Sequence, residues 1–519
     1  MEPYSSTVLW IVIVSFIVAF VLAFGVGAND VANSFGTSVG SRVLTLRQAC
    51  ILASIFEVAG SILLGYSVSE TIRKGIVDTD LFANDEKELM LGSLSALVGS
   101  ALWNLIATAL AMPISGTHTV VGATIGYALV ARGVDGVHWM ELVKIIASWF
   151  ISPILSGTIS VVLFVLLRKV VIRAERPLRN GLLLLPILFA VTVFINVFSI
   201  VHDGSPLLRF DRIPLWGALV TAFGAGLLTA AAVQLWLVPR IRTKQSDTTT
   251  TTTPAVGAAT IASVELGRGS VNSDDGKINP VFTIERAGRS VDYGTTTAAV
   301  ATATEVKSTE DAAPSDDKHS TDTDSVTANS QVSLASGEPT KPAEPLEDVA
   351  GEAQLFSPLQ ILTACFGSFA HGGNDVSNAV GPLVAVWLIY TEGSVAQESE
   401  TPIYVLAYGG LGITVGLWAL GRRVMRTIGE DLTRLTPATG FTIELGAAST
   451  VLLASKIGLP VSTTHCKVGS VVTVGWARSG GGGVSWRLFG GIATAWLVTV
   501  PVSAAASAAV MAFLTAVAL

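Results

Sequence analysis

The segment Gly27-Ala-Asn29-Asp30-Val-Ala-Asn33-Ser-Phe-Gly36 recurs as Gly372-Gly-Asn374-Asp375-Val-Ser-Asn378-Ala-Val-Gly381. A second segment, Pro113-Ile-Ser115-Gly-Thr117-His118, recurs as Pro460-Val-Ser462-Thr-Thr464-His465. The copies are 345 residues apart in the first case and 347 in the second. Two motifs that repeat at nearly the same offset indicate that the chain contains two related halves.

The chain between and around these motifs is unusually apolar. Hydrophobic residues make up 50% of the 519 residues and charged residues only 14%, which is more apolar material than a soluble protein can bury. A membrane-spanning helix needs about 20 mostly apolar residues. We therefore predict an all-α polytopic membrane protein with about twelve spans, near residues 8–28, 48–68, 89–112, 118–131, 141–167, 182–201, 214–238, 357–390, 403–421, 439–458, 463–478 and 488–518.

The distribution of basic residues predicts the orientation, because loops rich in Lys and Arg stay on the cytoplasmic side. With both termini outside, four basic segments fall on the cytoplasmic side, namely residues 42–47, 168–179, 240–244 and 422–426. This topology threads the two copies of the motifs in opposite directions. Such an inverted-topology repeat places its site near the midplane, where broken helices and re-entrant tips meet.

We expect three parts in the chain. Residues 1–238 form a first transmembrane half that contains repeat 1 over about 8–168, and residues 357–519 form the inverted repeat 2. Between them, residues 239–356 form an acidic loop: Gln245 to Phe356 holds 18 Asp/Glu against 7 Lys/Arg. Because this segment has too few apolar residues to offset its ordering entropy, we expect a disordered cytoplasmic loop.

The Asn-Asp motifs are candidate cation sites. Asp30 and Asp375 lie in apolar stretches, where a lone charge costs at least about 2.5 kcal/mol. Carboxylate and amide oxygens suit a hard cation, so the predicted sodium ligands are Asn29, Asp30, Asn33, Asn374, Asp375 and Asn378. The alternative is a structural network of Asn and Asp side chains. The glycines of these motifs make helix breaks cheap, or let helices pack closely.

The Pro-Ser-Thr-His motifs are candidate anion sites at re-entrant tips. Proline ends one helix and Ser or Thr caps the next, so that free backbone N–H groups face an anion. Paired tips from both halves can enclose a tetrahedral oxyanion, and the alternative is ordinary capping between packed helices. The predicted anion ligands are Ser115, Gly116, Thr117, Ser462, Thr463 and Thr464.

Four further residues are functional candidates. Glu57 and Glu444 are acids inside apolar segments, a placement typical of functional groups, although each acid can instead pair with another buried group. His118 and His465 follow the two tips. These imidazoles can bind substrate or relay protons, or they can be packing residues.

With these motifs the chain resembles the inorganic phosphate transporter (PiT) family. The resemblance is carried by both Asn-Asp motifs, both Pro-Ser-Thr-His tips, Glu57, Glu444 and the large hydrophilic loop. It implies a symporter that moves phosphate into the cytoplasm with sodium or protons, with Asp30 and Asp375 essential. Alternating access would follow cation binding at the two acids. We accordingly expect an integral plasma-membrane protein with no cofactor and no nucleic-acid partner.

Other functions stay open on the sequence alone. A sulfate permease would use the same oxyanion geometry, and a passive channel would line a continuous pore with polar rings. An intramembrane enzyme would use Ser115 with His118, or Ser462 with His465, as nucleophile and base. The driving ion, the stoichiometry, the oligomeric state (a homodimer included), regulators of the 239–356 loop and the membrane of residence are also open.

Overall fold

The computed structural model describes residues 1–30, 32–202, 204–243, 352–426, 432–479 and 483–519. These ranges are largely helical and form no strand beyond an isolated bridge between Val77 and Val137. The α-helices are α1 (Leu9–Asp30), α2 (Ala32–Gly40), α3 (Leu46–Glu70), α4 (Glu86–Ala109), α5 (Gly116–Arg132), α6 (Trp139–Leu167), α7 (Pro177–Val201), α8 (Leu215–Ala232), α10 (Glu352–Glu392), α11 (Ile403–Arg426), α12 (Pro437–Lys456), α13 (Thr463–Ser479) and α14 (Trp486–Ala518). The π and 3-10 turns are η1 (Thr71–Gly75), η2 (Thr79–Phe82), η3 (Gly133–Gly136), η4 (Arg168–Ile172), η5 (Pro206–Leu208), η6 (Phe210–Arg212) and η7 (Val233–Leu237).

Each of the twelve predicted spans coincides with one of these helices. Among the described residues, nine helices are long and apolar enough to cross a membrane. Helices α5 and α13, with 17 residues each, and the 41-residue α10 are not among the nine. The polytopic helical fold is thus confirmed, whereas the exact number of crossings stays a prediction.

The two halves pack with an approximate two-fold symmetry. Helix α3 packs against α10 as α11 packs against α1, and α14 packs against α4 and α5 as α6 packs against α12 and α13. Matching glycines make these contacts: a Cβ on Gly27 would lie 1.8 Å from the Ile413 carbonyl oxygen, and a Cβ on Gly372 would lie 2.2 Å from that of Glu57. The predicted duplication is therefore a structural repeat.

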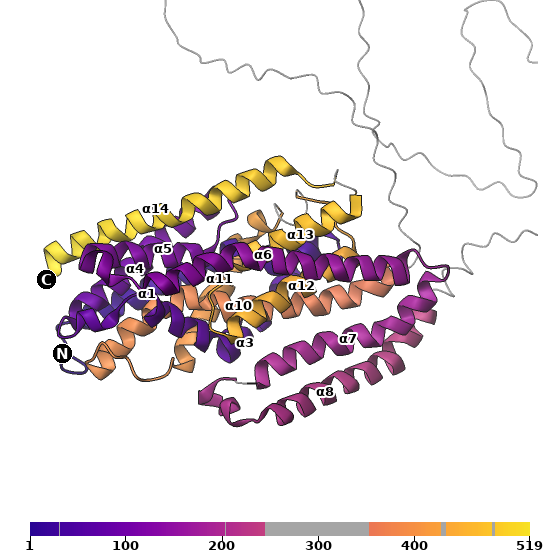
Figure 1. Cartoon of the computed structure of the whole chain (residues 1–519), viewed down its shortest axis with the longest axis horizontal. Coiled ribbons are helices and arrows are strands. Elements are labelled where there is room, and N and C mark those ends of the chain that lie inside the picture. The colour runs from indigo at the N-terminus through magenta and orange to yellow at the C-terminus, as the bar shows by residue number, and fades with distance from the viewer. Residues whose placement is uncertain (31, 203, 244–351, 427–431, 480–482) are drawn as a thin grey trace, which may run out of the picture. The chain divides into compact units, whose positions relative to one another are not determined.

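The two copies run in opposite directions, as predicted. The chain before α1 lies beside the end of α10, because the N–H of Tyr4 donates to the Tyr390 carbonyl at 2.9 Å and the Met1 ammonium donates to the Gly393 carbonyl at 3.3 Å. Both termini lie at one end of the helices (Figure 1). We call this the terminal end and the opposite one the basic end.

The hairpins α4–α5 and α12–α13 open toward opposite ends. Lys87, at the start of α4, donates to the carbonyl of Ala518 at the terminal end. Arg168 follows α6, which crosses to the basic end, and its guanidinium donates to the Ala477 carbonyl near the end of α13 at 3.3 Å. The basic loop after α6 is thus opposite the termini, as the charge pattern predicts, and the two hairpin tips converge between the ends.

The helix break predicted at the Asn-Asp motif is absent from repeat 2. Helix α10 runs without interruption through Asn374-Asp375. In repeat 1, α1 ends at Asp30 and α2 begins at Ala32, and residue 31 between them lies outside the described residues. The expectation of a break in repeat 2 is wrong. The reason is that Gly372 and Gly373 serve close packing: a Cβ on Gly373 would lie 2.6 Å from the Leu64 side chain.

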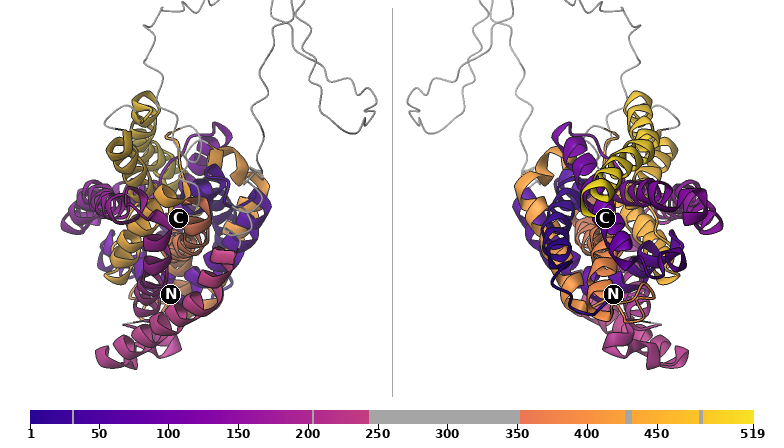
Figure 2. Two further views of the ribbon diagram at one scale, coloured as in Figure 1. Left: turned by 90° about the vertical axis from the view of Figure 1, so that its right-hand side faces the viewer. Right: turned by 90° about the vertical axis from the view of Figure 1, so that its left-hand side faces the viewer.

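Helices α7 and α8 lie side by side outside the repeat (Figures 1 and 2). Helical structure continues from α8 to Thr243, and α10 begins at Glu352. The expected loop over 239–356 is therefore helical at both edges, because apolar residues there pack on the bundle: Ile241 and Phe356 are buried in one cluster. Residues 244–351 of that loop lie outside the described residues.

Candidate functional site

The two hairpin tips contact each other through reciprocal hydrogen bonds. The Thr117 hydroxyl donates to the Val461 carbonyl at 3.0 Å, and the Thr464 hydroxyl donates to the Ile114 carbonyl at 3.0 Å. Each threonine belongs to the first turn of one tip helix and each carbonyl to the opposite tip. The N-termini of α5 and α13 are therefore held against each other, as the duplicated motif predicts.

Each tip helix begins with a serine cap. The Ser115 hydroxyl oxygen accepts from the His118 N–H at 3.2 Å, and that of Ser462 accepts from the His465 N–H at 3.2 Å. A serine that accepts in this way keeps its own O–H proton for another acceptor. The first N–H groups of a helix have no intrahelical acceptor, so two sets of backbone and hydroxyl donors are brought together.

Both acids of the Asn-Asp motifs reach the second tip. Asp30 Oδ1 accepts from the Thr464 hydroxyl at 3.1 Å, and Asp375 Oδ2 accepts from the Thr463 hydroxyl at 2.7 Å. Each aspartate is only 1% exposed. Because Thr463 and Thr464 are consecutive, the structure places two carboxylates from opposite repeats at the start of one helix.

Asp30 and Asn378 present unpaired polar atoms to the first tip. Among the described residues, Asp30 Oδ2 and both amide atoms of Asn378 are buried without a hydrogen-bond partner. Both face Gly116: a Cβ added there would lie 2.8 Å from Asn378 Nδ2 and 3.1 Å from Asp30 Oδ2. A buried unpaired carboxylate oxygen is costly, and a bound cation would satisfy it. The side chain of Asn33 lies outside the described part of the chain.

Asn29 and Asn374 hold the tips in place. Asn29 Nδ2 donates to the Met112 carbonyl at 2.9 Å, and Asn29 Oδ1 accepts from the Ile114 N–H at 3.1 Å. Asn374 contacts the Ser455 hydroxyl at 3.1 Å. With the oxygen and nitrogen of its side-chain amide exchanged, its N–H also donates to the Val461 carbonyl at 2.9 Å. The amide oxygen of Asn29 is therefore already engaged by the tip, as the structural alternative for these residues anticipates.

We predict that Asn29→Ala destabilises the protein by about 2 kcal/mol, because it leaves the buried Ile114 N–H and Met112 carbonyl without partners. Thermal unfolding in detergent measures this loss. An equal loss is expected for Asn374→Ala. A variant with wild-type stability and a strongly raised sodium requirement would instead identify Asn29 as a direct cation ligand.

His371 joins Asp375 to Glu57, and the sequence patterns did not single it out. Its Nδ1 lies 2.8 Å from Glu57 Oε2, and its Nε2 lies 2.9 Å from Asp375 Oδ2. Glu57 also accepts from the Ser368 hydroxyl at 2.8 Å. The signal that could have found His371 is its position in an apolar segment four residues before Asp375, which places both on one helix face.

Glu444 lies in a second buried polar cluster. Its Oε1 accepts from the hydroxyls of Thr37 and, at 2.9 Å, of Ser38, and its Oε2 accepts from Thr363 at 2.7 Å. Lys467, 2% exposed, lines the same small cavity as this carboxylate. An intramembrane lysine is a functional signal that the motif comparison overlooked. A cavity of about 20 Å³, large enough for one water molecule, is lined by Ser34, Gly367, His371, Glu444, Ala447, Ala448, Val451, Thr463 and Lys467.

His118 and His465 form an aromatic cluster instead of contacting the caps. Their ring centroids are 4.5 Å apart, His118 lies 3.8 Å from the ring of Trp149, and His465 lies 3.7 Å from that of Trp496. His465 Nδ1 contacts the Trp149 carbonyl at 3.0 Å. The serine caps meet the histidine backbones and not their rings, so the nucleophile and base arrangement of an enzyme is not formed.

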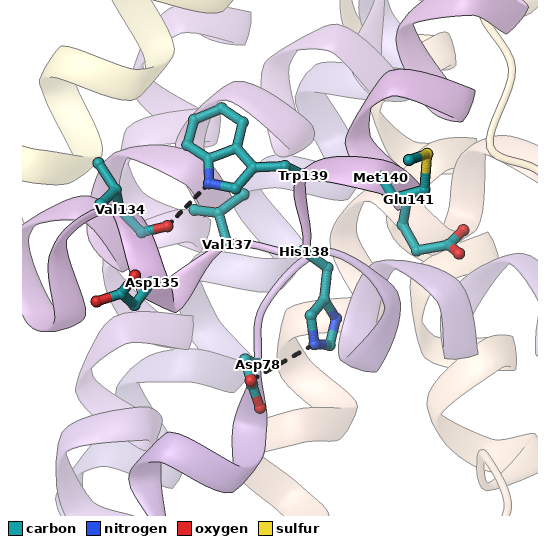
Figure 3. Close-up of a pocket in the computed structure, with 8 residues that line it drawn as sticks. All are labelled: Asp78, Val134, Asp135, Val137, His138, Trp139, Met140 and Glu141. Atoms are coloured by element: carbon teal, nitrogen blue, oxygen red, sulfur yellow. Dashed lines mark hydrogen bonds and ion pairs between the residues drawn. The ribbon is translucent and has the colours of Figure 1, made fainter.

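Figure 3 shows the residues that line a larger, open hollow of about 660 Å³. It is lined by Asp78, Val134, Asp135, Val137, His138, Trp139, Met140 and Glu141. His138 Nε2 lies 3.8 Å from Asp78 Oδ2, and both side chains are at least one-third exposed. None of these lining residues belongs to the duplicated motifs, so the buried region at the tips is the stronger candidate site.

Comparison with known proteins assigns the chain to a family. The phosphate transporter family matches residues 26–507. The chain is 44% identical to human sodium-dependent phosphate transporter 2, with 98% of each chain covered, and 43% identical to sodium-dependent phosphate transporter 1-B of Danio rerio, with 97% of this chain and 95% of that protein covered. A solved structure described as the sodium-dependent phosphate transporter superposes with a TM-score of 0.73 at 31% identity, covering 98% of this chain and all of that one. Sequence, fold and the paired tips thus agree that the chain belongs to the phosphate transporter family.

Proposed function

We propose that the chain is a secondary active symporter that moves inorganic phosphate into the cytoplasm together with sodium. The observation that supports this most is the meeting of two carboxylates and two capped helix N-termini from oppositely threaded repeats. The relatives named above are sodium-dependent phosphate transporters, which favours sodium over protons as the driving ion. Membership of a transporter family rules against the enzyme alternative.

Phosphate would bind between the tips. The backbone N–H groups at Gly116, Thr117, Thr463 and Thr464, with the O–H groups of Ser115 and Ser462, supply the donors that an oxyanion needs at a helix N-terminus. The hydroxyls of Thr117 and Thr464 already bind the opposite tips. We therefore assign these two hydroxyls to holding the tips together, and their N–H groups to the anion.

Sodium would bind at the acids. Asp30 Oδ2 and the Asn378 amide oxygen are the buried, unpaired oxygens that a cation would satisfy. Asp375 and Asn33 occupy the matching positions in the other repeat, and we propose them for a second sodium ion. Asn29 and Asn374 would support both sites indirectly, by positioning the tips.

Coupling then follows from charge. Without cations, the carboxylates of Asp30 and Asp375 repel an anion arriving at the tips beside them. Bound sodium removes this repulsion, so the affinities for sodium and phosphate rise together by linkage. Rocking of the repeats would then expose the loaded site to the cytoplasm, in the manner of inverted-repeat transporters.

Uptake into proteoliposomes tests the proposal. An inward sodium gradient should drive accumulation of radiolabelled phosphate above equilibrium, whereas a proton gradient alone should not. Arsenate should compete and sulfate should not. Saturable sulfate uptake, or phosphate flux that only equilibrates, would overturn the proposal in favour of a sulfate permease or a channel.

We further propose the plasma membrane as the location, a homodimer as the assembly, and regulation through residues 239–356. The nine helices suited to a bilayer support an integral membrane protein. Surface labelling of intact cells, crosslinking in native membranes and uptake by a chain lacking residues 245–350 test the three points separately.

A further inference from the structure

The two-fold symmetry fails at a group of buried charges. The repeat offsets and the matching glycine contacts pair residues of one half with counterparts in the other. In four cases the counterpart is apolar: Glu57 pairs with Ile413, His371 with Val26, Glu444 with Leu97, and Lys467 with Val120. All eight residues are buried. These four buried charged side chains therefore have no charged counterpart in the symmetry-related region of the other half.

The charged environment lies between the tips and the basic end. Glu444 belongs to the half of α12 nearer its start, which is at the basic end, and its carboxylate accepts from Thr37 and Ser38 of α2. Lys467 lies one helical turn beyond Thr463 on α13, on the way to the same end. Glu444, Lys467 and Thr463 line the 20 Å³ cavity together. This polar route begins at the site and leads toward the predicted cytoplasm.

The equivalent route toward the terminal end is closed by apolar packing. Val26, Leu97 and Ile413 are buried in one hydrophobic cluster, which also contains Leu383 and Val384 of α10. Leu383 occupies the position that matches Ser38. Where the basic side has a carboxylate bound by hydroxyls, the terminal side has Leu97 and Leu383 in one hydrophobic cluster. Among the described residues, only the basic side therefore presents carboxylates to a passing ion.

A route lined by carboxylates opposes the passage of phosphate. An anion that leaves the tips toward the basic end meets Glu444, and Glu57 and Asp375 lie close by; charges of like sign repel strongly where water is excluded. Lys467 is on the same helix as Thr463 and, at four residues' spacing, on the same face. Its ammonium is the group placed to offset the repulsion from Glu444.

We propose that Lys467 contacts phosphate on the release route, after the anion has left its binding site between the tips. Once the hydrogen bonds from Thr37 and Ser38 to Glu444 open, phosphate passes from the N-terminus of α13 to the Lys467 ammonium, while the Glu444 carboxylate prevents the anion from being held there. The matching pair Val120 and Leu97 on the terminal side supplies neither charge. This inference rests on the proposed phosphate transport and adds a residue that controls its release.

Turnover and equilibrium binding of phosphate, measured separately, test the proposal. For Lys467→Met we expect sodium-driven uptake to turn over at least about 10-fold more slowly, while the dissociation constant for phosphate at saturating sodium stays within about 2-fold, because release is impaired and the tips are intact. Lys467→Arg should keep most of the turnover. Val120→Ala, at the matching position of repeat 1, is the control and should transport like the wild type.

The partner acid gives a second and opposite signature. In Glu444→Gln the positive charge of the Lys467 ammonium is no longer offset by a carboxylate. Phosphate should therefore bind at least about 3-fold more tightly and dissociate more slowly. The double variant Lys467→Met/Glu444→Gln should turn over faster than Lys467→Met, because neither an unpaired lysine nor a repelling acid remains. This variant leaves neither partner charge unpaired, so it tests the proposal even if a single variant fails to fold.

The outcomes are distinct. If the wild type shows no sodium-driven phosphate uptake, the proposed function fails. If the wild type transports and Lys467→Met keeps its turnover, only the release role fails. A loss of phosphate binding in Lys467→Met, or weaker binding in Glu444→Gln, would overturn the inference and assign the pair a purely structural role.

Discussion

Asp30→Asn is expected to raise the sodium concentration needed for half-maximal phosphate uptake by about 100-fold or more. The substitution keeps the shape of the side chain but removes the charge beside the unpaired amide of Asn378 and the Gly116 tip. Loss of one partner from a buried charge pair costs about 3 to 5 kcal/mol, and each 1.4 kcal/mol is about a tenfold change in affinity. Initial uptake rates in proteoliposomes, titrated with sodium, measure the effect.

A matched control separates this effect from the removal of an aspartate carboxylate elsewhere in the protein. Asp78→Asn removes the same type of acid from the surface pocket, and its sodium dependence should equal that of the wild type. Folding of both variants is checked by gel filtration. Wild-type sodium dependence in folded Asp30→Asn would refute the assignment of Asp30 to the cation.

Gly27→Ala is expected to prevent folding, although it adds a single methyl group. The new Cβ would lie 1.8 Å from the carbonyl oxygen of Ile413 and 2.5 Å from its carbonyl carbon. Because these are backbone atoms of α11, relief requires α1 and α11 to separate, and overpacking of this kind costs about 3 kcal/mol or more. Fluorescence-detected gel filtration should show little monodisperse protein.

Glycines elsewhere in the chain provide the control. At Gly224 in α8 and Gly490 in α14, an added Cβ would have no atom within 4 Å apart from the adjoining residues and backbone of its own helix. Alanine is the better helix former by about 1 kcal/mol, so Gly224→Ala and Gly490→Ala should express at least as well as the wild type. Normal folding of Gly27→Ala would show that the close approach of α1 and α11 is dispensable.

Six of the predicted site residues fall into three groups in the structure. The acids Asp30 and Asp375 meet the Thr463-Thr464 tip, which the duplicated motifs anticipated. Asn29 and Asn374 instead bind the tips, and His118 and His465 pack on tryptophans. Sequence spacing places polar residues near one another, but it does not state which hydrogen-bonding partner each amide or imidazole selects.

His371 and Lys467 show where comparison of the repeats was insufficient. A search for matching residues finds what the halves share, whereas these two residues have the apolar counterparts Val26 and Val120. Glu57, which contacts His371, and Glu444, which lines one cavity with Lys467, come from other helices. Such pairs across helices become visible only once the helices are packed.

By itself the sequence determined the helical membrane fold, the duplication and the opposite threading of the halves, because apolar length, motif offset and loop charge are properties of the chain read in order. Only the tertiary structure decided that α10 stays unbroken, that Asn29 and Asn374 anchor the tips, and that buried charges line one route but not its equivalent. Those outcomes depend on which helices pack against each other. Atoms from elsewhere in the fold decide whether a glycine forms a packing contact or a helix break. They likewise decide whether a buried carboxylate binds an ion or accepts hydrogen bonds from a neighbouring helix.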